Sequence, residues 1–160
     1  PYTFRQRHAG ESKMNPLVVV QFLGLVVSKM TGSILPTSFL LFGGVGAIGI
    51  VIHVLMLWIC LSLLGFNFVV AQAVATVVSM TSNFVLNNQF TFADKKLKGW
   101  HIAGGLVAFY VICSIGAIAN VSVASWIFQM DRSAYFAGVT GALMSVVFNY
   151  AVSRAIVWRA

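Results

Sequence analysis

Residues 68–92 read FVVAQAVATVVSMTSNFVLNNQFTF and contain no charged side chain. The run is longer than the roughly 20 residues of helix that cross a bilayer core. Ala71, Ala75, Ser79, Asn83 and Asn87 follow one another at intervals of four, so they share one face of a helix. In lipid, a stripe of small and polar residues lets two helices approach closely. The stretch therefore predicts a membrane-spanning helix that packs along this face.

The rest of the chain has the same apolar character. Of its 160 residues, 59% are hydrophobic and 8% are charged, whereas a soluble domain carries about a quarter charged residues. So few polar side chains cannot cover a water-facing surface, and the composition predicts a membrane protein. Cys60 and Cys113 lie singly in apolar runs, without the spacing of a metal or redox site. We interpret both as small buried residues.

Four apolar runs are long enough to span the membrane, at residues 39–64, 68–90, 102–128 and 135–158. The loops between them are short, so neighbouring spans should be antiparallel. An offset of 66 residues superimposes the second span on the fourth, with Asn83 over Asn149 and Phe92 over Trp158. The predicted fold class is an all-α membrane protein with four transmembrane helices in two pseudo-repeated hairpins. A homo-oligomer is left open.

Glycines in the first span predict a second close-packing face. Gly43, Gly46 and Gly49 follow at intervals of three. The first and third spans resemble each other only loosely, through GAIG at residues 46–49 and GAIA at residues 116–119.

The segment before the first span differs from the four runs. Residues 17–27 are apolar but too short to span, and Gln21 interrupts them. Asn15 can cap a helix and Pro16 suits its first position. This predicts an amphipathic helix at residues 15–30 in the plane of the cytoplasmic interface. A second short interfacial segment is expected between residues 31 and 38.

Basic residues set the predicted orientation. Four spans place nine of the ten Lys and Arg on one side and leave only Arg132 on the other. Because Lys and Arg collect in cytoplasmic loops, this predicts a multi-pass protein of the inner (cytoplasmic) membrane with both termini in the cytoplasm. The net charge of +7 then faces anionic membrane lipid rather than nucleic acid, because the basic residues are scattered among loops. The nine residues are Arg5, Arg7, Lys13, Lys29, Lys95, Lys96, Lys98, Arg154 and Arg159.

Polar side chains within the spans form a candidate intramembrane site, composed of His53, Asn83, Asn87, Asn120 and Asn149. The asparagines either hold helices together or contact a lipid headgroup or substrate. His53 is either a hydrogen-bonded residue of the bundle or a functional one. All three acidic residues lie outside the spans, which argues against a proton-coupled cation exporter. The sequence offers no metal-binding motif.

The quoted stretch, together with the number of spans, the loop charges and the repeat, resembles the GtrA-like family of small membrane proteins. That family is linked to polyprenyl-phosphate sugar metabolism, and the resemblance covers residues 39–158. Residues 1–14, PYTFRQRHAGESKM, are similar to the end of the catalytic domain in dolichol-phosphate mannose synthase-like enzymes of glycosyltransferase family two. The shared pattern falls on Arg7, Gly10, Ser12, Lys13 and Met14.

The two resemblances imply that this chain is the C-terminal part of a fused enzyme. Residues 1–14 would be the tail of the glycosyltransferase domain, residues 15–38 interfacial helices, and residues 39–160 a GtrA-like bundle that shapes a groove for the lipid tail. Arg7, Gly10, Ser12 and Lys13 would bind the lipid or donor phosphate, because guanidinium, hydroxyl and ammonium groups suit phosphate oxygens. The plainer alternative is that the basic residues here only face lipid headgroups.

The implied partners are membrane lipid, an undecaprenyl or dolichyl phosphate, and an upstream catalytic domain in cis. No catalytic residue and no cofactor is expected in this chain. The resemblance implies that the upstream domain would carry the hexosyltransferase activity and bind Mg²⁺ or Mn²⁺. Three functions remain open. They are the membrane region of a polyprenyl-phosphate glycosyltransferase, a translocase of lipid-linked sugar in cell-surface polysaccharide synthesis, and a structural anchor or oligomerisation bundle.

Overall fold

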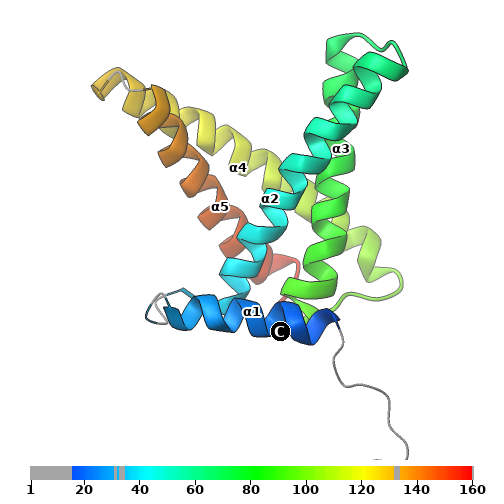
Figure 1. The fold of residues 1–160 in the computed structure, drawn as a ribbon, viewed down its shortest axis with the longest axis vertical. Helices are drawn as coiled ribbons and strands as arrows, with labels where there is room; N and C mark the ends of the chain where they lie inside the picture. The colour runs from blue at the N-terminus through cyan, green and yellow to red at the C-terminus, as the bar shows by residue number, and fades with distance from the viewer. Residues whose placement is uncertain (1–15, 31, 33–34, 132–133, 160) are drawn as a thin grey trace, which may run out of the picture.

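The computed structural model describes residues 16–30, 32, 35–131 and 134–159 (Figure 1). This part of the chain consists of helices joined by short loops and contains no strand, which confirms the predicted all-α class. The elements are α1 (Pro16–Met30), α2 (Thr37–Trp58), the π-helix η1 (Ile59–Leu63), α3 (Phe68–Leu86), the π-helix η2 (Asn87–Thr91), the short 3₁₀ helix η3 (Ala93–Lys95), α4 (His101–Asp131) and α5 (Ala134–Ile156).

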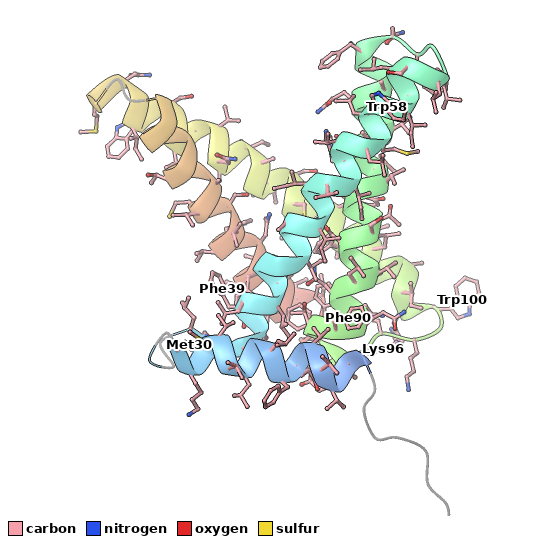
Figure 2. All side chains as sticks on the ribbon, viewed as in Figure 1. Met30, Phe39, Trp58, Phe90, Lys96 and Trp100 are labelled. Atoms are coloured by element: carbon pink, nitrogen blue, oxygen red, sulfur yellow. The ribbon has the colours of Figure 1, made fainter. Side chains whose placement is uncertain are left out.

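The long helices form two antiparallel hairpins, α2 with α3 and α4 with α5 (Figure 1). The hairpins meet at one end and diverge toward the other. We call the end where they meet the basic end, because the α3–α4 loop with Lys95, Lys96 and Lys98 and the C-terminal Arg154 and Arg159 lie there. Figure 2 shows Lys96 and Met30 both at this end, on opposite sides of the view.

Within the described residues, three helical segments are long and apolar enough to cross a membrane: Thr37–Leu63, Phe68–Thr91 and His101–Ile127. Their aliphatic side chains point outward, and Ile50 and Val51 are each 67% exposed, as expected of surfaces that contact lipid. The chain is therefore a multi-pass membrane protein. The fourth crossing stays a prediction. α5 has 23 residues, which corresponds to about 34 Å of helix and matches a bilayer core of about 30 Å.

α1 is too short to span a bilayer and lies across the basic end (Figure 1). Gly24 brings it close to α2, because a Cβ at this position would lie 2.9 Å from Thr37 Cγ2. Ser28 Oγ donates a hydrogen bond of 2.7 Å to the carbonyl oxygen of Leu35. The expected second interfacial segment is wrong in its last two residues, because Thr37 and Ser38 already form the first turn of α2.

A cluster of aromatic residues at the basic end holds the two hairpins together. Trp158, just past α5, is fully buried and stacks on Phe92, just past η2, with ring centroids 4.4 Å apart. It also stacks on Phe84 of α3 at 5.6 Å and meets Phe109 of α4 edge-on at 5.8 Å. The two aromatic residues that the 66-residue offset superimposes are thus in direct contact across the bundle.

Asn88 in η2 fixes the loop that leads from the first hairpin to the second. Its Oδ1 accepts hydrogen bonds from the backbone N–H of Leu97 at 2.8 Å and from the indole N–H of Trp158 at 3.0 Å. Its Nδ2 donates to the carbonyl oxygen of Leu97 at 3.2 Å. A single buried amide therefore connects α3, the basic loop and the end of α5.

Candidate lipid-binding groove and intramembrane polar cavities

The residues predicted to bind phosphate, Arg7, Gly10, Ser12 and Lys13, lie outside the described part of the chain. The description begins at Pro16, the first residue of α1. α1 is the first described element after this segment in the sequence.

An apolar groove of about 350 Å³ lies where α1, α2 and the end of α3 come together. It extends along α2 from Leu40 to Ile48, a distance of about 12 Å. Gly44 leaves its wall open, because a Cβ at this position would meet no atom within 4 Å. Figure 2 shows Phe90, one of its lining residues, beside α1 at the basic end. The complete lining is Val20, Leu40, Leu41, Gly44, Val45, Ile48, Leu86 and Phe90.

Sequence reasoning expected a groove for a lipid tail but identified none of these residues. Each is an ordinary apolar residue of its helix, and the groove exists only because α1 packs against α2 and η2. The sequence could have indicated open space at this point through the adjacent glycines Gly43 and Gly44. Of these two, only Gly44 lines the groove.

Two cavities within the spans contain four of the five predicted intramembrane polar residues. The first, of about 290 Å³, lies between α2 and α3 and is lined by His53 and Asn83 together with Thr76 and Ser79. The two hydroxyls already have acceptors, because Ser79 Oγ donates to the carbonyl oxygen of Gly49 at 2.8 Å and Thr76 Oγ1 to that of Gln72, also at 2.8 Å. The cavity therefore presents mainly the His53 ring and the Asn83 amide.

The second cavity, of about 100 Å³, lies between the two hairpins and brings together Asn83, Asn87 and Asn149. The oxygen of Asn87 accepts a hydrogen bond of 2.7 Å from Thr91 Oγ1. Within the described residues, the Oδ1 atoms of Asn83 and Asn149 are buried and accept no hydrogen bond. Asn120, half-buried on α4, lines neither cavity.

Each hairpin contains the same contact between an asparagine and a glycine. The Asn83 amide rests on Gly49, and the Asn149 amide rests on Gly116; a Cβ at either glycine would overlap the amide. The contact supports the interpretation of the asparagines as residues that pack helices together. The predicted glycine face is only partly correct. A Cβ added at Gly43 or Gly46 would meet no atom within 4 Å, so neither glycine makes a close helix contact. The structural counterpart of Gly116 is Gly49, not Gly46.

The cysteines are only partly as predicted. Cys60 is fully buried, whereas Cys113 is half-buried and lines the cavity between the hairpins. Both are free thiols.

Replacing Gly49 by alanine is expected to lower the free energy of unfolding by about 1–3 kcal/mol, because the added methyl group overpacks the contact with Asn83. In the Gly49→Ala/Asn83→Ala double variant most of this loss should disappear. Gly46→Ala is the matched control and should change little, because its Cβ enters open space. Reversible unfolding in detergent gives the free energy of unfolding of each of these variants. A loss at Gly46→Ala equal to that at Gly49→Ala would contradict the assigned contact.

Residues 41–158 match a family model described as the GtrA/DPMS transmembrane domain. A dolichol-phosphate mannosyltransferase of Pyrococcus furiosus is 29% identical to this chain over 161 residues, which cover 99% of the chain and 44% of that relative. The chain thus spans less than half the length of the curated relative that it matches. The matched range extends from α2 to Trp158 and includes both asparagine–glycine contacts and the aromatic cluster.

Proposed function

This chain belongs to the GtrA/DPMS transmembrane domain family, and from this premise we propose that it is the membrane region of a polyprenyl-phosphate glycosyltransferase. In this role it anchors a catalytic domain in cis and places the lipid acceptor. The basic end faces the cytoplasm, and both termini lie on that side of the inner membrane.

The observation that carries the proposal is the position of the apolar groove. It lies against α1, which crosses the basic end (Figure 1), and α1 follows Arg7, Ser12 and Lys13 in sequence. A polyprenyl phosphate has a charged headgroup on a long branched hydrocarbon chain. The start of its tail fits the groove, while the phosphate lies at headgroup depth near the basic segment. The relative named as a dolichol-phosphate mannosyltransferase supports this class of acceptor.

In the proposed reaction an oxygen of the lipid phosphate attacks the anomeric carbon of a nucleotide sugar. The new carbon–oxygen bond replaces the bond to the nucleoside diphosphate, which leaves with its electron pair. Arg7, Lys13 and Ser12 stabilise the phosphate oxygens by charge and hydrogen bonding. We assign the Mg²⁺ or Mn²⁺ that the family resemblance implies to the catalytic domain. The described part of this chain brings no three His, Cys, Asp or Glu side chains together.

Filling the groove with Gly44→Leu is expected to raise KM for a long-chain polyprenyl phosphate about tenfold, equivalent to about 1.4 kcal/mol of lost binding, with kcat unchanged. The fold should tolerate the change, because the new side chain enters open space. The measurement is the formation of lipid-linked sugar by the full-length protein in liposomes.

Two controls accompany this measurement. An acceptor whose tail is too short to reach the groove should be used equally well by wild type and variant. Val51→Phe, on a lipid-exposed position of the same helix, should leave KM unchanged. An unaltered KM in Gly44→Leu would remove the groove from acceptor binding.

A translocase of lipid-linked sugar is the second candidate, and the cavity that contains His53 and Asn83 favours it, because this cavity places polar groups inside the membrane. A translocase requires His53→Leu to slow the movement of lipid-linked sugar between leaflets while leaving sugar transfer intact. If neither transfer nor movement depends on the chain, it is an anchor.

A further inference from the structure

The exposed Trp100 at the start of α4 separates two hollows at the basic end. One hollow, of about 530 Å³, lies between the start of α4 and the end of α5. The other, of about 490 Å³, lies on the start of α4 and the two residues before it. The two share Trp100 and no other lining residue. Figure 2 shows Trp100 pointing away from the bundle, on the side of the α3–α4 loop.

The larger hollow has the character of an anion site. Arg159 and His101 line it, and no acidic side chain does. Among the described residues, neither Arg159 nor His101 takes part in an ion pair or a hydrogen bond through its side chain. The Arg159 guanidinium can therefore bind two phosphate oxygens side by side, and an imidazole N–H can donate to a third. Gly104 leaves space for such a group, because a Cβ there would meet no atom within 4 Å.

The smaller hollow has the character of a hydrocarbon site. Its lining consists of Trp100 and the apolar or side-chain-free residues Gly99, Ile102, Ala103 and Leu106. An anion-binding hollow and an apolar hollow on the two sides of one tryptophan match an amphipathic molecule better than a free anion. Tryptophan is also enriched at the depth where headgroups meet acyl chains.

We propose that these two hollows form a binding site for an anionic membrane phospholipid, with its phosphate on Arg159 and His101 and an acyl chain on Ile102 and Leu106. The site is separate from the groove described above, because the two have no lining residue in common. It also does not depend on the proposed glycosyltransferase role. An ordered lipid here would bridge the start of α4 and the end of α5, next to the aromatic cluster that joins the hairpins.

Trp100 is a built-in probe for this site. The full-length protein is reconstituted in phosphatidylcholine vesicles that contain a small fraction of either phosphatidylglycerol or phosphatidylcholine with brominated acyl chains, which quench tryptophan fluorescence on contact. Subtracting the signal of Trp100→Phe removes the contribution of the other tryptophans. We expect brominated phosphatidylglycerol to quench Trp100 several-fold more strongly than brominated phosphatidylcholine.

Arg159→Gln should lower this preference about fivefold, the factor that corresponds to one basic residue at an anionic surface. Gly104→Leu should lower it by occupying the hollow without removing a charge. Lys95→Gln is the matched control, since it removes one charge from the neighbouring loop but does not line the hollow. Millimolar inorganic phosphate should not compete, whereas competition would point to a free-phosphate site instead. Equal quenching by the two lipids in wild type, or an unchanged preference in both variants, would overturn the proposal.

Discussion

Replacing Trp158 by alanine is expected to lower the free energy of unfolding by about 3–5 kcal/mol. The side chain is fully buried and contacts Phe92, Phe84 and Phe109, so its loss opens a cavity among residues of both hairpins. The indole hydrogen bond to Asn88 is lost as well. Because lipid cannot enter this closed cluster, the destabilisation should appear in detergent and in bilayers alike.

Unfolding of the purified protein in a denaturing detergent gives this free energy. Trp158→Phe keeps one aromatic ring but removes the N–H donor and part of the ring volume, so its free energy of unfolding should lie between that of wild type and that of Trp158→Ala, with about 1 kcal/mol of the loss from the hydrogen bond alone. Trp126→Ala is the matched control, since that side chain is 62% exposed and should change stability little. Equal losses in Trp158→Ala and Trp126→Ala would contradict the assignment of this cluster as the joint between the hairpins.

Arg7→Ala and Lys13→Ala are each expected to reduce the rate of sugar transfer about 100-fold, because each removes a group that stabilises phosphate charge in the transition state. The assay follows the formation of lipid-linked sugar by the full-length protein in liposomes that contain a polyprenyl phosphate. Lys29→Ala controls for the loss of one basic residue near the same membrane surface, since Lys29 lies in the last turn of α1. Its rate should stay within about twofold of wild type.

Undiminished transfer by folded, inserted Arg7→Ala and Lys13→Ala would leave the opening segment as headgroup-facing charge. The translocase and the anchor would then be the better accounts of the bundle. Loss of transfer in Lys29→Ala to the same extent would show that overall basic charge matters rather than the particular phosphate-binding pattern.

The helical class could be predicted from the length of the apolar runs. The packing stripes could be predicted from the regular spacing of small and polar residues within those runs. The interval of four from Ala71 to Asn87 gives the face of α3 that packs on α2, and Ala71 and Ala75 are indeed fully buried. The 66-residue offset was informative for the same reason, since Asn83 and Asn149 occupy equivalent contacts in their hairpins. These features require only the geometry of a single helix.

The residues missed by sequence reasoning depend on how helices cross. The period of three in Gly43, Gly46 and Gly49 cannot indicate which glycine meets a neighbouring amide, because that depends on the rotation and crossing of two helices. Asn88 lies one position off the stripe of α3 and was not predicted. It lies in the π-helix η2, whose wider turn accompanies the burial of both Asn87 and Asn88. The groove likewise requires three elements that no sequence period relates.

Covalent photo-crosslinking tests the proposed placement of the acceptor lipid most directly. A polyprenyl phosphate with a diazirine near the start of its tail is added to the full-length protein in liposomes, and the modified peptides are identified by mass spectrometry. The account predicts adducts on residues that line the groove, such as Ile48, Leu86 and Phe90, and their loss in Gly44→Leu. Adducts confined to α4 and α5, with none in the groove, would contradict it.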